Sequence, residues 1–177
     1  MKTMHRIGAL VLASGLLTGM ASGARLLVPL DYPTIQQAID AAANGDEILV
    51  SPGLYRGDPD DTESLVKLNG KSIWLHSSDG PEKTILDGEL QRPLIDLLFS
   101  EDENTRIEGF TLIRGYANAG GALRIGGTPQ IINCIIRDNL GQTGAGGMLC
   151  SDPVGPTLEN VVFCHNTISL NNEAHYL

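Results

Sequence analysis

One passage occurs twice in the last third of the chain. Residues 120–139 read GGALRIGGTPQIINCIIRDN, and residues 146–166 read GGMLCSDPVGPTLENVVFCHN. Gly121 corresponds to Gly147 at an offset of 26 residues, and Pro129 corresponds to Pro156 at an offset of 27. A repeat of this length is typical of solenoid proteins, in which each repeat buries its apolar face only against its neighbours. The repeat therefore predicts a stack of similar coils.

The residues within each repeat predict strands. Apolar residues alternate over short runs rich in Ile, Val and Phe, as around Asn133, and Gly, Pro, Asp and Asn separate the runs. A period of two, interrupted in this way, is typical of strands and tight turns. Two or three strands per coil predict an all-β fold, a parallel β-helix in which each strand pairs with the coils above and below.

Earlier coils are indicated by a weaker third copy and by shorter apolar runs. The third copy covers residues 107–115. The shorter runs are residues 47–50, 65–68, 72–75, 84–86 and 94–98. At about 25 residues per repeat, we expect about five or six coils.

The segment before the first of these runs predicts a short amphipathic helix. Its apolar face consists of Ile35, Ala38, Ile39 and Ala42. Thr34 followed by Gln37 is typical of a capping box, and Asn44-Gly45 is expected to end the helix. We expect this helix to cover the open end of the first coil. The alternative is a surface helix of an α/β domain, although no second helical pattern follows to build one.

Residues 1–23 have the pattern of a Sec-type signal peptide. Lys2 and Arg6 precede an apolar stretch, and Ala21-Ser22-Gly23 fits a small-residue cleavage site. The stretch is too short for a membrane span, and no later segment is long and apolar enough to cross a bilayer. We therefore expect a secreted protein, located in the periplasm, at the cell surface or outside the cell. Its parts are a signal peptide (1–23), a segment with the capping helix (24–46) and the coils (47–177).

The charge of the chain limits its partners. The formal net charge is −9, and removal of the signal peptide would take away two basic residues. Such a surface repels nucleic acid and anionic polysaccharide unless cations intervene. We therefore expect no nucleic-acid partner, and the charge favours neutral polysaccharides, cations or cell-surface proteins.

The run YPTIQQAIDAAANGDEILVSPGLYRG, residues 32–57, resembles the N-terminal segment of right-handed parallel β-helix proteins of the pectin-lyase-like superfamily. The later repeats are similar to those of many secreted bacterial β-helix proteins. The resemblance implies a right-handed coil. This superfamily contains polysaccharide lyases, hydrolases and esterases as well as adhesins and structural stalks, so the fold does not decide the function.

For an enzyme, the resemblance to pectate lyases implies an acidic calcium site and an arginine base. The calcium candidates are Asp87, Asp96 and Asp102, and the catalytic candidates are Arg114, Arg137 and Asp138. Arg114 aligns with Asp138 one coil later, so the two are expected at the same corner of neighbouring coils. The alternative is a surface ion pair, which contributes little stability. The segments that characterise pectinesterases and polygalacturonases do not occur in the chain.

The repeated glycine pairs and asparagines allow a binding and a structural interpretation. Residues 120–123, 146–149 and 163–166 resemble repeats of polymorphic outer-membrane proteins, which are β-helical adhesins. Alternatively, the glycine pairs permit tight turns with positive φ. Asparagines at equivalent positions would then stack as side-chain amide ladders, Asn133 on Asn160 and Asn139 on Asn166.

The three cysteines are expected to be buried thiols. Cys134 aligns with Val161, so Cys164 lies three positions farther along its coil, about 10 Å in an extended strand. A disulfide needs a shorter separation. The spacing of Cys134, Cys150 and Cys164 also does not match a zinc site.

After Asn166 the sequence TISLNNEAHYL contains no cap that could cover the last coil. Either the chain is a shortened β-helix, which we favour, or the open end pairs with another chain, which predicts self-association through this coil.

Together, these patterns predict a secreted β-helix with a binding or structural role. The alternative is a carbohydrate-active enzyme, a polysaccharide lyase or glycoside hydrolase with calcium as its cofactor, or an inactive remnant of one.

Overall fold

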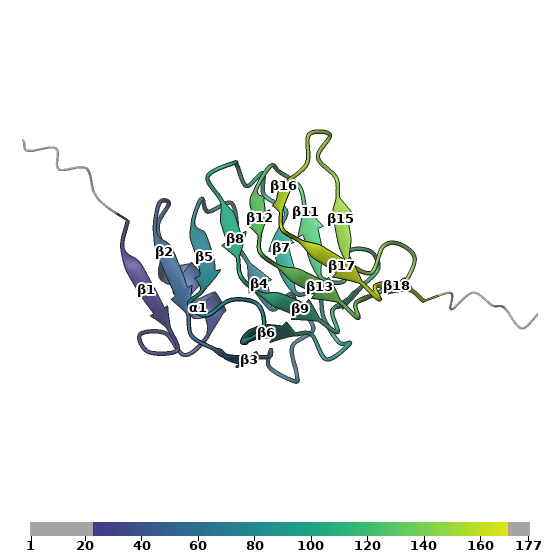
Figure 1. The fold of residues 1–177 in the computed structure, drawn as a ribbon, viewed down its shortest axis with the longest axis horizontal. Coiled ribbons are helices and arrows are strands. Elements are labelled where there is room, and N and C mark those ends of the chain that lie inside the picture. The colour runs from purple at the N-terminus through teal and green to yellow at the C-terminus, as the bar shows by residue number, and fades with distance from the viewer. Residues whose placement is uncertain (1–22, 170–177) are drawn as a thin grey trace, which may run out of the picture.

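The computed structural model describes residues 23–169, which form a parallel β-solenoid of about five turns (Figure 1). Four parallel sheets run along it. Sheet A contains β1 (Arg25–Val28), β2 (Glu47–Val50), β5 (Trp74–Ser77), β8 (Arg106–Glu108), β12 (Gln130–Ile132) and β16 (Thr157–Glu159). Sheet B contains β3 (Gly53–Tyr55), β6 (Thr84–Asp87), β9 (Thr111–Ile113), β13 (Ile135–Arg137) and β17 (Val162–Cys164). Sheet C contains β4 (Val66–Lys67), β7 (Ile95–Leu97), β11 (Leu123–Ile125) and β15 (Met148–Cys150). Sheet D contains β10 (Tyr116–Ala117), β14 (Leu140–Gly141) and β18 (Thr167–Ile168).

The repeat register predicted from the sequence is confirmed in sheets A and B, whereas in sheet C Leu123 pairs with Met148, one residue short of the predicted offset of 26. Ile131 pairs with Leu158, and Ile135 pairs with Val162, in parallel ladders. The predicted run 107–115 divides into β8 and β9, because Gly109 makes the turn between them with a φ of 78°. The fold is therefore the predicted parallel solenoid.

The core is a column of aliphatic side chains that point into the coil. Sheet A contributes one such column in which the members pair in register and are fully buried: Ile48, Leu75, Ile107 and Ile131. Each fully buried aliphatic side chain contributes about 1.5–3 kcal/mol relative to an exposed one. The repeat thus builds the core one layer per coil.

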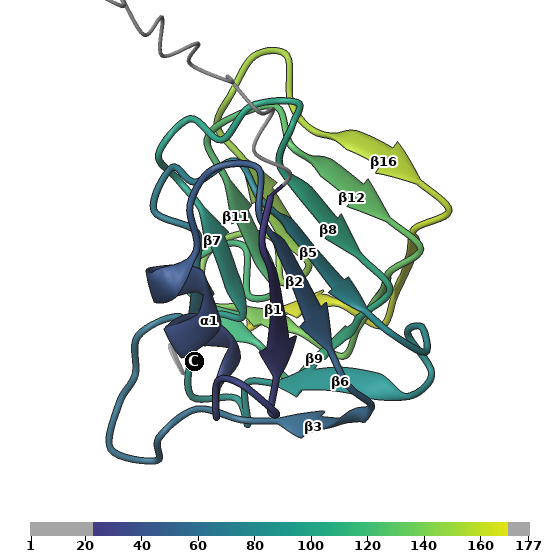
Figure 2. The same cartoon turned by 90° about the vertical axis from the view of Figure 1, so that its left-hand side faces the viewer.

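Helix α1 (Ile35–Ala41) closes the amino-terminal end of this core, as predicted. Its four predicted apolar residues are buried, and the helix packs against β1, β2 and β4. Figure 2 looks onto this end, with α1 beside β1. The Thr34 Oγ1 atom accepts a hydrogen bond from the backbone N–H of Gln37 at 3.2 Å. The helix ends before the predicted Asn44-Gly45 stop.

Two features of this end were not indicated by the sequence patterns. Strand β1 precedes the helix and pairs with β2 over its whole length. The Nζ atom of Lys71 donates hydrogen bonds to the carbonyl oxygens of Ile39, Asp40 and Ala42 at 2.6, 2.9 and 2.8 Å. A lysine side chain thus supplies hydrogen-bond donors to the last carbonyl oxygens of the helix, where a glycine capping motif was expected.

Both predicted asparagine ladders are present. The Nδ2 atom of Asn160 donates to Oδ1 of Asn133 at 2.7 Å, and that of Asn139 donates to Oδ1 of Asn166 at 2.9 Å. Asn139 is fully buried, and its Oδ1 atom also accepts the backbone N–H of Gly115 at 2.7 Å. The side chains of Asn139 and Asn166 therefore satisfy backbone groups at the turns, as the structural interpretation predicts, whereas Asn133 and Asn160 bind each other and Asn133 also binds Glu108.

The glycine pairs act differently from the expectation. Gly120 has a positive φ, 70°, but Gly121, Gly146 and Gly147 do not. A Cβ atom at Gly121 would lie 2.7 Å from the carbonyl oxygen of Gly146 in the next coil. The prediction of positive φ was wrong for these three glycines, and at Gly121 the glycine permits close stacking of neighbouring coils.

The cysteines are free thiols in the described part of the chain. Cys134 is fully buried, as predicted, and burial raises its pKa to about 11. Cys150 and Cys164 are only half-buried. Within residues 23–169, no helix has the length and apolar character needed to cross a membrane.

Candidate functional site

A cavity of about 460 Å³ lies between the start of α1 and the loop 56–65, which connects β3 to β4. Pockets of this size accommodate small ligands. Its wall includes the charged residues Arg56, Asp58, Asp61, Lys67 and Arg92. Apolar and hydroxyl-bearing side chains, among them Leu54, Tyr55 and Leu65, complete it. The cavity therefore offers both charge and apolar contact.

Gln36 attaches the helix to the floor of this cavity. Its Nε2 atom donates to the carbonyl oxygen of Lys67 at 3.2 Å, and its Oε1 atom accepts the backbone N–H of Lys67 at 2.8 Å. The side-chain amide thus pairs with β4 as a neighbouring strand would. This contact satisfies the edge of sheet C and holds α1 against the loop.

Arg92 is the most unusual residue of the cavity. It is 1% exposed, yet no carboxylate among the described residues forms an ion pair with it. Its Nη2 atom donates to the carbonyl oxygen of Asp58 at 2.5 Å, and its buried Nε–H has no acceptor. The guanidinium lies directly on Gly57, where a Cβ atom would clash with it. A buried cation with an unsatisfied donor is rare in proteins.

An arginine–carboxylate cluster borders one side of the cavity. The Oδ2 atom of Asp87 lies 3.1 Å from Nε of Arg56, and its Oδ1 atom lies 2.8 Å from Nε of Arg114. Glu89 adds a second carboxylate 3.3 Å from Arg56. Burial alone would raise the pKa of Asp87, but hydrogen bonds from Arg114, the backbone of Glu89 and Arg56 outweigh it and lower the pKa. Asp87 is therefore held ionised.

A second cluster borders the cavity on sheet C. Arg124 binds Asp96 through two nitrogens, at 2.6 Å to Oδ1 and 2.5 Å to Oδ2. Ser64, which also lines the cavity, donates to Oδ2 of Asp96 at 2.7 Å and accepts from Arg124 at 2.9 Å. The bidentate geometry fixes the position of Ser64 in the cavity wall.

The structure places the predicted catalytic residues at one corner of the solenoid, but their side chains form separate ion pairs and not one cluster. Arg114 and Asp138 lie on neighbouring coils, and the N–H of Arg114 donates to the carbonyl oxygen of Asp138 at 3.2 Å. Their side chains diverge, because Arg114 binds Asp87 whereas Asp138 binds Arg137. The Nδ1 atom of His165 lies 3.8 Å from Asp138. Asp138 and Arg137 thus form a surface ion pair.

The three calcium candidates lie apart. Asp87 and Asp96 each face an arginine, whereas Asp102 accepts hydrogen bonds from Ser72 at 2.9 Å and from Asn104. Among residues 23–169, no group of three or more His, Cys, Asp or Glu side chains is arranged to hold a metal ion. Calcium binding by these residues stays a prediction.

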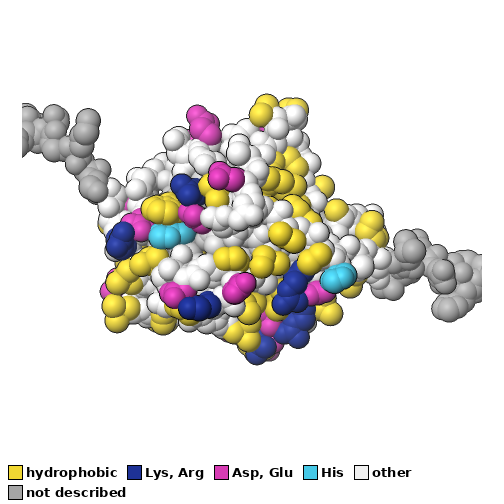
Figure 3. Space-filling view, in the orientation of Figure 1, with side chains coloured by type: hydrophobic (Ala, Val, Ile, Leu, Met, Phe, Trp, Pro, Cys, Tyr) yellow, Lys and Arg dark blue, Asp and Glu magenta, His cyan; other side chains and the backbone are white. Residues whose placement is uncertain are grey.

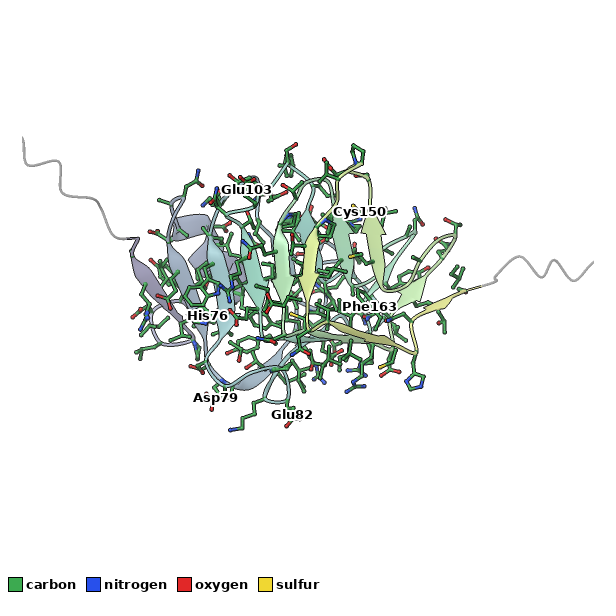
Figure 4. The ribbon with its side chains drawn as sticks, turned by 45° about the horizontal axis from the view of Figure 1, so that its top comes forward. His76, Asp79, Glu82, Glu103, Cys150 and Phe163 are labelled. Carbon is green, nitrogen blue, oxygen red and sulfur yellow. The ribbon has the colours of Figure 1, made fainter. Side chains whose placement is uncertain are left out.

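A polar and aromatic cluster covers the outer face of sheet A. The rings of Trp74 and His76 stack with centroids 3.9 Å apart, and the guanidinium of Arg106 lies 5.1 Å from the Trp74 ring. His76 also contacts Glu47 at 2.7 Å. Figure 4 shows His76 on this sheet, and Figure 3 shows charged side chains of both signs interspersed on the same side of the molecule. Because these side chains come from neighbouring strands and contact one another, the cluster stabilises the pairing of β2, β5 and β8.

Arg92 and the cavity could not be found from the sequence patterns. The one available signal is the loop 56–65, RGDPDDTESL, an acidic insertion that separates two strands of one coil. Arg92 itself belongs to no repeat or motif.

No family model, curated protein or solved structure matches the chain.

Proposed function

We propose that this protein is a secreted ligand-binding module of the β-helix class and that the cavity beside α1 is its binding site. The observation that carries this proposal is the cavity itself, 460 Å³ in volume and lined by tyrosine, apolar and charged side chains. Polysaccharides, as the likeness to pectin-lyase-like proteins suggests, are the ligand class to examine first. The signal-peptide pattern of residues 1–23 supports the proposed location outside the cell.

The protonation states of the clusters favour binding over catalysis. A general acid needs a raised carboxyl pKa, and a general base must lose its proton near neutral pH. The pKa of Asp87 is lowered, chiefly by Arg114 acting against burial, and the hydrogen bond to Asp87 raises the pKa of Arg114. Neither group is tuned for proton transfer at neutral pH.

The second candidate function is a polysaccharide lyase or glycoside hydrolase. The arginines and carboxylates gathered around Asp87 and Asp96 favour it, because enzymes that act on sugars use such groups. The two functions differ in whether the polysaccharide is cleaved.

Retention on immobilised neutral and acidic polysaccharides, with and without calcium, tests the proposal. Asp61 lines the cavity mouth and Asp60 does not. Asp61→Trp should weaken retention by about tenfold or more, because the indole fills the cavity, whereas Asp60→Trp should have no effect. Equal effects of the two substitutions, or no retention on any polysaccharide, would contradict the proposal.

Reducing-end formation and the absorbance of unsaturated products are followed in the same samples. Product formation that disappears in Arg114→Ala would instead support the enzyme.

A further inference from the structure

We infer that the cavity binds a carboxylate group and that Arg92 is the residue that holds it. This inference rests on the proposed function, since it takes the cavity as the ligand site. It adds the chemical class of the ligand group that enters the cavity: a single carboxylate carried on an uncharged, partly apolar body.

The first argument is the missing partner of a buried cation. Removing a guanidinium from water costs several kcal/mol, which proteins normally offset with a carboxylate. Arg56, which also lines the cavity, follows this rule through Asp87, and the nearby Arg124 follows it through Asp96. Arg92 is the more deeply buried residue, and within residues 23–169 its guanidinium has the carbonyl oxygen of Asp58 as its one acceptor. The counterion is therefore expected from a ligand.

The second argument is geometric. A carboxylate accepts two parallel hydrogen bonds from a guanidinium, and the free Nε–H of Arg92 supplies one of these donors. The carbonyl oxygen of Asp58 holds Nη2, and the Cβ-less surface of Gly57 lets the guanidinium lie flat. Arg92 is thus preorganised, and a ligand does not have to pay for ordering its side chain.

The surroundings of Arg92 select for a single charge. Asp58 and Asp61 also line the cavity, and each accepts a backbone N–H within its own loop, from Asp60 at 3.0 Å and from Glu63 at 2.8 Å. These carboxylates repel a multiply charged anion such as phosphate or sulfate. The apolar part of the wall, Pro33, Ile35, Leu54 and Leu65, suits the uncharged body of a ligand.

The test is an NMR titration of the arginine Nε–H signals of the purified protein. The probes are sodium benzoate, its neutral isostere benzamide, and sodium sulfate. Benzoate should shift the Arg92 signal in a saturable manner, with an affinity about tenfold or more above that of benzamide. Equal affinities, saturation by sulfate alone, or no saturable shift with benzoate would overturn the inference.

Three variants assign the effect to Arg92. Arg92→Lys keeps the charge but removes the paired donors, so benzoate binding, followed by calorimetry, should fall by about tenfold or more. Gly57→Ala keeps Arg92 and places a methyl group against its guanidinium, and should weaken binding comparably. Arg137→Lys, on a distant coil, is the matched control and should bind as the parent protein does. If Arg92→Lys fails to fold, the parent titration and Gly57→Ala decide.

The two proposals can fail separately. Polysaccharide retention that is lost in Asp61→Trp but unchanged in Arg92→Lys would leave the binding module intact and refute the carboxylate site. Benzoate binding without polysaccharide retention would keep the cavity as a carboxylate site and refute polysaccharides as its ligand class.

Discussion

At the scale of single residues, Asp87 connects two arginines from different coils. Its side chain is 1% exposed, whereas Arg56 and Arg114 each reach solvent. Asp87→Asn should lower the free energy of unfolding by about 2–3 kcal/mol at neutral pH, because charge-assisted hydrogen bonds are lost. The folded-state pKa lies below the usual 3.8, so this stabilisation is present above that pH and is lost as the pH falls through the folded-state pKa.

Urea unfolding of the parent and the variant from neutral to strongly acidic pH measures this difference. The two stability curves should converge at acidic pH. Asp79→Asn, at an exposed ion pair with Lys83, is the control and should leave the free energy of unfolding almost unchanged, because water screens the pair. Curves that stay parallel would show that Asp87 is not the linked group.

Asn139 is the second residue with a large predicted effect. Its amide binds the N–H of Gly115 and the carbonyl oxygens of Leu112 and Arg137 while fully buried. Asn139→Ala should therefore cost about 2–4 kcal/mol, since these buried groups lose their partner. Asn166→Ala removes fewer hydrogen bonds from a more exposed side chain, so it should lower the free energy of unfolding by less. Thermal and urea denaturation compare the two, and an equal cost would refute the argument.

At the scale of elements, α1 depends on a residue that lies outside it. Lys71 binds three carbonyl oxygens at the helix carboxyl end, where the helix dipole also favours a cation. Lys71→Met should lower the free energy of unfolding by about 2 kcal/mol and increase hydrogen exchange in α1. Lys83→Met, at the exposed pair with Asp79, supplies the comparison and should leave exchange in α1 unchanged. Unchanged exchange in Lys71→Met would mean that the helix is held by its apolar face alone.

At the scale of the whole molecule, the two ends of the solenoid differ. Helix α1 covers the first coils, whereas Leu158 and Phe163 in the last described coil are each 42% exposed. Their equivalents one coil earlier, Ile131 and Ile136, are fully buried. Phe163 is labelled at this end in Figure 4. We propose that a second copy of the chain packs on this surface, because exposed apolar side chains and unpaired strand edges favour association with another chain.

Sedimentation of the full chain over a range of concentrations tests this pairing. The parent protein should show concentration-dependent association, and the double substitution Leu158→Lys with Phe163→Lys should abolish it through charge repulsion. Leu90→Lys, at an exposed leucine far from this end, should have no effect. A protein that stays monomeric at every concentration would rule out the pairing.

Much of the fold could be predicted because its signals are local. The period of two around Asn133 and the offset of 27 between Pro129 and Pro156 define strands and register together, and the structure follows both. The glycine pairs are the exception, because Leu123 pairs with Met148 at an offset of 25 and not at the predicted 26. The helix was predictable from four apolar positions, but β1 was not, because the short run 25–28 has no neighbouring repeat with which to align.

The amino-acid sequence by itself determined the parallel solenoid, its capping helix and its asparagine ladders, because repetition places like residues on like positions of successive coils. Only the tertiary structure decided which unlike residues meet. Arg92 donates a hydrogen bond to the carbonyl oxygen of Asp58, 34 positions earlier in the chain. The side chain of Arg114 forms its ion pair with Asp87 and not with Asp138. Such contacts depend on side-chain direction and on the path of the irregular loop 56–65, and neither is encoded in a repeat.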